Sequence, residues 1–217
     1  MTRNYTSLPT ILLLLMLLFA GCQKEKEYYY NVPDGFKAYA YFKPGSYWIY
    51  LNEKTGKADC TYVASFYPGT HVSGDNGTSD PKVTREYTSI KLAGKLLSGI
   101  TVEAQSGDDA TMDVNQVNPY AGDIRVSYSL LLNPHMTPTN YEEELWNYGI
   151  SAVYPEVTVN GNSFSGVYNL HEDGLTYLGD SIAYDVQLVK NIGFIKFRFY
   201  KEQADTTWSL VRWNIVQ

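Results

Sequence analysis

The sequence predicts a mainly β protein, either all-β or β-rich α+β, made of antiparallel sheets with one short helix near residues 140–148. Runs of aromatic and β-branched residues alternate in polarity with the period of two that is typical of half-buried strands. Turn-forming Gly, Pro and Asn-Gly segments separate these runs. Aromatic residues make up 15% of the chain, and such side chains are enriched in sheets. Both a sandwich and a curved half-barrel fit this pattern.

The first predicted hairpin joins Tyr47–Leu51 to a second alternating run over residues 58–65, so we expect Trp48 and Tyr62 on paired strands. Residues 68–81 are rich in Pro, Gly, Ser, Asp and Asn without an apolar period, which predicts a long exposed loop. Two further strands are expected, at 84–92 and 99–104.

The predicted helix begins near Thr139, whose hydroxyl and the side chain of Glu142 form the pattern of a capping box. Acidic residues at 142–144 favour the positive N-terminal end of a helix. Gly149 is the expected end of this helix.

The C-terminal third of the chain predicts a second hairpin and three terminal strands. Residues 153–159 and 163–168 flank Asn160-Gly161, a dipeptide that readily adopts the positive φ angles of a tight turn. The terminal strands are expected at 183–189, 194–200 and 208–215.

The first 22 residues have the features of a bacterial lipoprotein signal. A positive start is followed by an apolar run over residues 11–19, which is shorter than the roughly 20 residues of a spanning helix. Phe19-Ala20-Gly21-Cys22 resembles a lipobox, which implies that Cys22 carries the lipid. We therefore expect a signal peptide at 1–21, a lipidated tether at 22–35 and a single β-rich domain at 36–217.

The charge of the chain argues against a nucleic-acid partner, and its two cysteines argue against a disulfide bond within the chain. With 17 Lys and Arg against 23 Asp and Glu, the formal net charge is −6, and no basic cluster suits the phosphates of a nucleic acid. Lipid on Cys22 leaves Cys60 without a disulfide partner in this chain, and we expect Cys60 to be a small buried side chain.

Two segments resemble Bacteroidetes outer-membrane lipoproteins of unassigned function. Phe42-Lys43-Pro44-Gly45-Ser46-Tyr47-Trp48 is similar to their opening strand, and residues 191–197 with 207–211 are similar to their terminal strand pair. The resemblance implies an outer-membrane location and a β-rich domain. It carries no catalytic residue across, because its motifs describe strands and turns.

No catalytic or metal-binding motif is found, so we expect neither enzymatic activity nor a cofactor. His71, His135 and His171 form no zinc-ligand pair. Residues 171–174, His-Glu-Asp-Gly, are interpreted as a turn at a hairpin end. Two acidic groups lack the spacing of a calcium loop and are interpreted as solvated loops. They consist of Asp75, Asn76 and Asp80, and of Asp108, Asp109 and Asp113.

The abundance of tyrosine has two interpretations, a structural one in the sheet and a functional one as a platform for a sugar ring or a protein partner. The candidate platform residues cluster around the predicted helix. They are Tyr120, Tyr141, Trp146, Tyr148 and Tyr154. Tyr28-Tyr29-Tyr30, close to the lipid site, is expected to dock as a first strand, with interfacial tyrosines at the headgroups as the alternative.

The expected function is that of a membrane-anchored, non-catalytic binding module at the surface or the periplasmic face of the outer membrane. Its expected partners are the membrane, through Cys22, and a glycan or an envelope protein. A structural component of an envelope complex and a carrier of an apolar ligand in a concave sheet are the alternatives.

Overall fold

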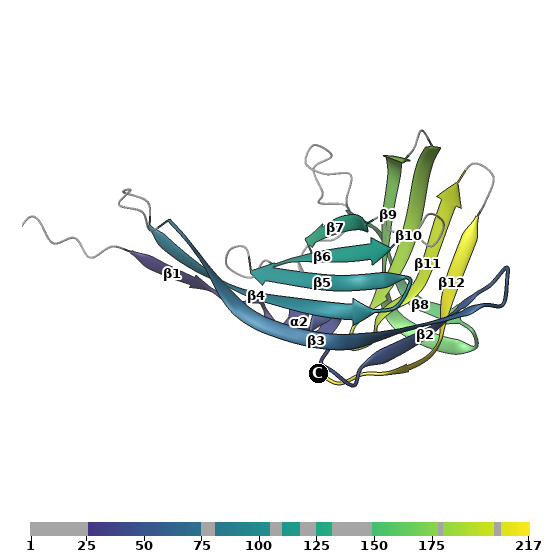
Figure 1. Cartoon of the computed structure of the whole chain (residues 1–217), viewed down its shortest axis with the longest axis horizontal. Coiled ribbons are helices and arrows are strands. Elements are labelled where there is room, and N and C mark those ends of the chain that lie inside the picture. The colour runs from purple at the N-terminus through teal and green to yellow at the C-terminus, as the bar shows by residue number, and fades with distance from the viewer. Residues whose placement is uncertain are drawn as a thin grey trace, which may run out of the picture.

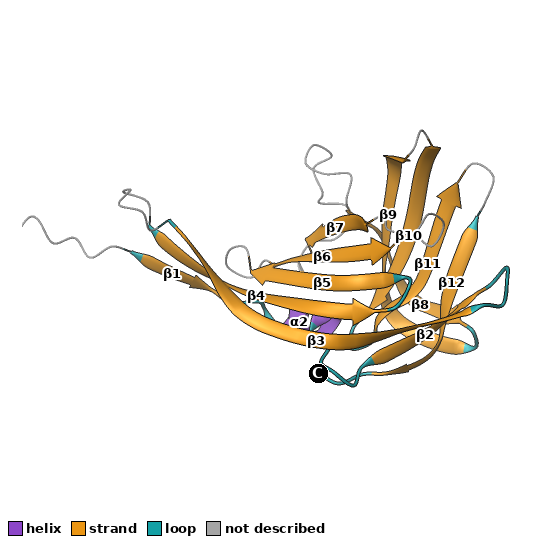
Figure 2. Cartoon of the chain, viewed as in Figure 1, coloured by secondary structure: helices purple, strands orange, loops and turns teal. Residues whose placement is uncertain are grey.

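The computed structural model describes residues 26–74, 81–104, 110–117, 125–131, 149–177, 180–201 and 205–217. It confirms a mainly β fold with one short helix, in which the sheet is strongly curled as a half-barrel (Figure 1 and Figure 2). The elements are β1 Glu27–Tyr30, α2 Asp34–Ala40, β2 Tyr47–Asn52, β3 Ala58–Ser73, β4 Lys82–Ala93, β5 Leu97–Ala104, β6 Ala110–Val117, β7 Arg125–Leu131, β8 Gly149–Val159, β9 Asn162–Tyr177, β10 Asp180–Val189, β11 Gly193–Lys201 and β12 Thr206–Asn214.

The 12 strands in the described part of the chain form one sheet made of two antiparallel meanders. Its order is β7-β6-β5-β4-β3-β2-β12-β11-β10-β9-β8, and β1 adds to β4 in parallel. The two meanders meet where β2 pairs with β12, so that Trp48 lies opposite Trp213. Each meander follows chain order, which is the arrangement that short hairpin connections favour.

The predictions for the C-terminal meander are confirmed. Asn160 and Gly161 have φ angles of 48° and 81° and connect β8 to β9 as the predicted tight turn. The three terminal strands are β10, β11 and β12. In β11, Phe197 and Phe199 are buried while Arg198 is exposed, as the alternation indicates.

The first predicted hairpin is confirmed as β2 and β3, with Tyr47 opposite Tyr62 and Trp48 opposite Thr61. However, the inward face of β3 carries Asp59, Thr61 and Val63. The carboxylate of Asp59 accepts hydrogen bonds from Thr61 Oγ1 at 3.0 Å and from the Lys95 amide at 3.1 Å. These bonds satisfy polar groups that would otherwise be costly to bury.

The prediction of an exposed loop over residues 68–81 is wrong for residues 68–73, which belong to a strand. β3 runs to Ser73 and pairs with β4 from Lys82 onwards, while residues 75–80 lie outside the described ranges. Pro68 lies within β3, opposite Thr88. Because β2 pairs only with residues 58–62 of β3, Pro68 sits where β3 has β4 on one side, a position that tolerates the missing N–H.

Residues 27–30 and Val32 contact the body of the fold directly. Tyr28-Tyr29-Tyr30 belong to β1, which confirms the expected docking as a strand, and Val32 is 1% exposed. These residues fall within the range assigned to the tether.

The helix expected near 140–148 lies outside the described residues, and α2 is a helix that sequence analysis did not predict.

Helix α2 lies inside the curl of the sheet. It follows Pro33, whose φ of −59° suits entry into a helix, and it buries Phe36 and Ala40. Tyr39 packs edge-on against Tyr168 of β9, and Tyr41 packs against Phe66 of β3. Because β2, β12, β11 and β10 separate β3 from β9 in the sheet, an element that touches both must occupy the concave side.

The core fills the concave side with side chains from both meanders. Tyr50 of β2 packs edge-on against Phe197 of β11 with ring centroids 5.3 Å apart, and its hydroxyl donates to the Phe194 carbonyl at 2.8 Å. Trp48 Nε1 donates to the Ile192 carbonyl at 2.6 Å. Inward-facing residues are thus buried on one side, and the convex side is the face that remains for solvent or partners.

Candidate functional site

The convex side of β2, β3 and β4 carries four tyrosines, which we call the tyrosine face. Tyr47 and Tyr62 lie directly opposite each other on β2 and β3. Tyr67 of β3 and Tyr87 of β4 are diagonal neighbours, because Tyr67 pairs with Ser89 and Gly69 pairs with Tyr87. Strand alternation positions them, since their neighbours Trp48, Val63 and Thr88 point into the core.

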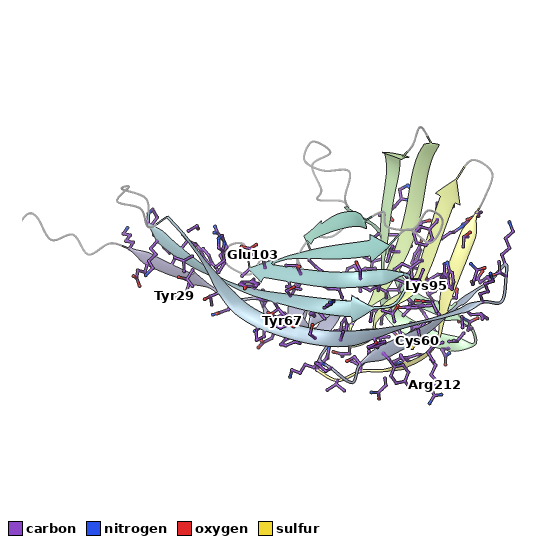
Figure 3. The ribbon with its side chains drawn as sticks, viewed as in Figure 1. Tyr29, Cys60, Tyr67, Lys95, Glu103 and Arg212 are labelled. Atoms are coloured by element: carbon purple, nitrogen blue, oxygen red, sulfur yellow. The ribbon has the colours of Figure 1, made fainter. Side chains whose placement is uncertain are left out.

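Tyr62 and Tyr67 are the most open members of the tyrosine face, with 50% and 61% of their surface exposed. Figure 3 shows Tyr67 on the long curved strand β3, with its side chain on the surface. Tyr67 follows Tyr62 by five positions, which corresponds to about 16 Å along a strand. Two aromatic pairs therefore stand at a spacing that a short polymer could bridge.

A glycine shapes one end of the tyrosine face. A Cβ atom at Gly69 would lie 2.7 Å from ring atoms of Tyr87, so the Tyr87 ring rests directly over the Gly69 backbone. A glycine beneath an aromatic ring allows this close cross-strand approach. The ring of Tyr87 thus lies over Gly69, on the same face of the sheet as Tyr67.

Polar groups occupy the space between the two tyrosine pairs. Ser65 lies opposite Lys91, one step from the Tyr67 and Ser89 pair, and Lys91 is exposed. Among the described residues, the Oγ atom of Ser65 is shielded from solvent and has no hydrogen-bond partner. Aromatic surface for stacking on β3 thus lies beside polar groups of Ser89 and Lys91 on β4.

The structure describes one of the five platform residues that the sequence predicts. Tyr154 lies on β8 and is 39% exposed, away from the tyrosine face in the sheet order. Tyr120, Tyr141, Trp146 and Tyr148 lie outside the described residues, as does the lipidation candidate Cys22. Sequence reasoning missed Tyr62 and Tyr67, because alternation alone does not say which face of β3 is buried, and the register shift between Val63 and Ser65 turns Tyr67 to the same face as Tyr62.

A second cluster of functional groups lies on the convex side of β9, β10 and β11 around Asp185. The strand register places His171, Asp185 and Arg198 side by side. His171 Nδ1 lies 2.7 Å from Asp185 Oδ1, and the hydroxyl of Tyr200 donates to Asp185 Oδ2. Because an ionised carboxylate can only accept, His171 Nδ1 carries the hydrogen of this bond.

The neighbours of Asp185 extend this network across four strands. Asn169 Nδ2 donates to Ser151 Oγ of β8 at 2.9 Å and to Asp185 Oδ1 at 3.4 Å. The guanidinium of Arg198 lies 4.4 Å from the ring centre of Tyr200 and pairs with Asp205 at 2.7 Å. The cluster therefore ties β8 to β11 together on their outer side.

The pKa values of the cluster follow from these contacts. Burial acts to raise the pKa of Asp185, but hydrogen bonds from Tyr200 and His171 outweigh burial and hold that pKa below its ordinary value. Burial and the hydrogen bond to Asp185 raise the pKa of Tyr200 to about 12. The hydrogen bond to Asp205 raises the pKa of Arg198. Near neutral pH, Asp185 is thus an anion between a neutral Tyr and a charged Arg.

The interpretation of residues 171–174 as a turn is wrong, because β9 continues from Asn162 to Tyr177. His171 is a strand residue opposite Asp185. His171 and Glu172 pair with Asp185 and Tyr184 of β10, and Asp173 and Gly174 lie where the register between β9 and β10 shifts. No local motif in the sequence could have joined His171 to Asp185, since the register between the two strands brings them together.

No group of three or more His, Cys, Asp or Glu side chains within the described ranges is placed to hold a metal ion. His71 lies 3.6 Å from Glu103 on the convex side of β3 and β5. Asp113 belongs to β6. The other residues of the acidic groups, together with His135, lie outside the described residues.

Cys60 is exposed, so the expectation of a buried thiol is wrong. The alternation of β3 explains the difference, because Asp59 and Thr61 point inward and Cys60 between them points outward. Figure 3 shows Cys60 on the surface of the strand.

The concave side is packed with the protein's own residues. Ile90, Val102, Met112 and Leu188 are at most 1% exposed, and they line the inner face of both meanders. No helix in the described part of the chain combines the length and the hydrophobicity needed to cross a membrane.

No protein-family model, curated protein or solved structure matches this chain.

Proposed function

We propose that the protein is a lipid-anchored lipoprotein of the outer membrane, of the Bacteroidetes type, that binds a glycan on its tyrosine face without catalysing a reaction. The observation that carries the proposal is the pair of exposed rings, Tyr62 and Tyr67, each with a second tyrosine beside it. Anchoring rests on the lipobox at residues 19–22 and places the lipid on Cys22.

The chemistry of the tyrosine face favours a glycan over an apolar ligand. Tyrosine rings offer flat apolar faces on which the C–H groups of a sugar ring pack, and their hydroxyls reach solvent. Between the rings, Ser89 and Lys91 supply hydrogen-bonding groups of the kind that sugar hydroxyls need. A span of about 16 Å between Tyr62 and Tyr67 suits several linked sugar units rather than one.

The packed concave side is the reason for placing the proposed site on the convex side. A carrier of an apolar ligand needs an open apolar concavity, whereas Tyr50, Val102 and Leu188 are completely buried there. The convex tyrosines are available to a polymer without any rearrangement of the core.

A glycan array tests the binding proposal. The full lipidated chain is compared with a Tyr62→Ala, Tyr67→Ala double variant and with Tyr154→Ala, an exposed tyrosine of β8 that serves as the matched control. Loss of two stacking rings should weaken capture of a recognised glycan at least about tenfold, which is about 1.4 kcal/mol. The control should bind like the wild type, and all three proteins should unfold at similar temperatures.

Two results would contradict the binding proposal: a glycan captured equally well by the double variant, or the absence of any captured glycan. Anchoring is tested separately by Cys22→Ser, which should move the protein from the membrane fraction to the soluble fraction. Protease treatment of intact cells then decides the side of the membrane. Removal of the domain indicates the cell surface, and protection until the outer membrane is broken indicates the periplasm.

A further inference from the structure

We propose that the free end of the β1–β4–β3 ribbon is a second membrane contact, which seats tyrosines in the headgroup layer beside the lipid anchor. We call this end the ribbon tip and define it by Glu27–Tyr29, Val72–Ser73 and Lys82–Thr84. The inference rests on the lipid anchor of the proposed function, and it goes beyond it by assigning an orientation to the domain.

The ribbon projects away from the body of the sheet. Figure 1 shows β1 and the ends of β3 and β4 extending together to one side. β1 pairs with β4 from Glu27 opposite Lys82 to Tyr30 opposite Arg85. The tip is therefore the point at which the chain departs toward Cys22.

Covalent length keeps the ribbon tip close to the membrane. Residues 23–26 are all that separate Cys22 from Glu27. Fully extended, the five steps from Cys22 to Glu27 span at most about 18 Å. Once the acyl chains on Cys22 lie in the bilayer, the tip must remain within that distance of the lipid attachment.

Aromatic and aliphatic side chains gather at the ribbon tip on both of its faces. Tyr29, Thr84 and Val72 form one row across the three strands, and Tyr29 and Val72 are 65% and 47% exposed. On the opposite face, Tyr28 is 39% exposed and stacks nearly parallel to Tyr30, with ring centroids 6.4 Å apart. Figure 3 shows Tyr29 projecting from this end of the ribbon.

The polar groups of the ribbon tip are paired within the ribbon. Lys82 Nζ lies 3.2 Å from the Glu27 carboxylate across β1 and β4, and Arg85 donates to Ser73 Oγ at 2.9 Å. Pairing reduces the cost of bringing charges to a less polar medium. Tyrosine is enriched at membrane interfaces, because its ring is apolar and its hydroxyl stays hydrated. The composition of the tip therefore suits the headgroup layer.

Seating of the ribbon tip would also hold the tyrosine face clear of the membrane. Tyr67 lies six residues along β3 from Ser73, which is about 20 Å of strand, and Tyr62 lies further from the tip. Lipid and ribbon together would act as two points of attachment, and two attachments restrict the domain more than a single flexible tether.

An environment-sensitive fluorophore at the ribbon tip tests the proposal. The lipidated full-length chain carrying Tyr29→Cys and Cys60→Ser is labelled with a nitrobenzoxadiazole probe and reconstituted into phosphatidylethanolamine and phosphatidylglycerol vesicles. The wild-type chain, labelled at its own exposed Cys60, is the control. In Figure 3, Cys60 lies toward the end of the molecule opposite Tyr29. Acylated Cys22 has no free thiol in either protein.

The expected result is a blue-shifted emission at position 29 that headgroup-level spin-labelled lipids largely quench, with no shift or quenching at Cys60. Water-like, unquenched emission at position 29 from protein that floats with the vesicles would overturn the membrane contact and leave the anchor intact. In that case the tip is open to a protein partner. Failure of the wild-type chain to float would remove the anchor itself, and the membrane contact with it.

Discussion

Glu86 of β4 and Tyr41, the residue that follows α2, are joined by a hydrogen bond of 3.0 Å from the Tyr41 hydroxyl to Glu86 Oε1. The other carboxylate oxygen accepts from the Val32 amide at 2.9 Å, and Lys37 Nζ lies 3.2 Å from Oε1. Burial, together with Glu86, raises the pKa of Tyr41 and keeps it a donor. A single carboxylate thus fastens both ends of the α2 segment to the sheet.

Replacing Glu86 with Ala should detach the α2 segment from β4. The change leaves the Val32 amide, which belongs to a buried residue, and the Tyr41 hydroxyl without their acceptor. We expect the free energy of unfolding to fall by about 2 to 3 kcal/mol, since hydrogen bonds to charged groups are involved. Urea denaturation measures the loss. Glu86→Gln, which keeps one acceptor oxygen, should lose less, and equal losses would show that the acceptor role is not the cause.

Replacing Tyr200 with Phe should change the response of stability to acid. The low pKa of Asp185 in the folded protein stabilises it above about pH 4, the ordinary value for Asp, and this gain is lost as pH falls through the folded pKa. Without the Tyr200 hydroxyl that pKa rises toward the ordinary value. We expect the variant to be about 1 kcal/mol less stable near neutral pH.

The stability curves of the wild type and of Tyr200→Phe should therefore converge as the pH is lowered below about 4, because the variant has less stabilisation to lose. Urea unfolding over a series of pH values measures both curves. Tyr154→Phe, at an exposed tyrosine of β8, is the control and should follow the wild type. Curves that stay parallel down to low pH would contradict the role of the Tyr200 hydroxyl.

Replacing Gly94 with Ala should destabilise the turn between β4 and β5. A Cβ atom there would lie 2.9 Å from the backbone Cα of Thr61, a completely buried residue that cannot move aside. We expect a loss of about 1 to 3 kcal/mol, as for other overpacked sites. Gly35→Ala in α2 is the matched control, because a Cβ atom at Gly35 meets no atom within 4 Å.

The Gly35 control should stay unchanged or gain up to about 1 kcal/mol, since Ala favours a helix over Gly. Thermal unfolding of both variants measures the contrast. Equal melting temperatures for the two glycine variants would show that the close approach of Gly94 to Thr61 does not cause the loss of stability.

The thiol of Cys60 should react with Ellman's reagent in the folded, lipidated protein. It is exposed on the convex side of β3, and its neighbours Asp59 and Thr61 take the inward positions. We expect native protein to release thionitrobenzoate as fully as unfolded protein does. Cys60→Ser should release none if Cys22 carries the proposed lipid. A thiol that reacted only after denaturant was added would show that Cys60 is buried in the core.

Much of the fold could be predicted from local chemistry in the sequence. Alternating polarity marks β2, β10, β11 and β12, and Asn160-Gly161 specifies the turn between β8 and β9 because its positive φ angles suit few other residues. These features depend on a few neighbouring residues, so the folded structure shows the strands and the turn that the local sequence predicts.

Turn composition was less reliable where strand pairing opposed it. Residues 68–73 and 171–174 have turn-rich compositions but lie in β3 and β9, where residues 68–73 pair with β4, and His171 and Glu172 pair with β10. The energetic gain of pairing belongs to two distant segments, and neither segment alone shows it.

The sequence by itself determined which residues alternate, where most of the strands run and where the chain turns. Tertiary structure alone decided which face of β3 is buried, and so placed Asp59 inside and Cys60 and Tyr62 outside. It also brought His171 to Asp185 and Tyr67 beside Tyr87. The physical reason is that a period of two defines two faces without naming the inner one, and that register is set by partner strands far along the chain.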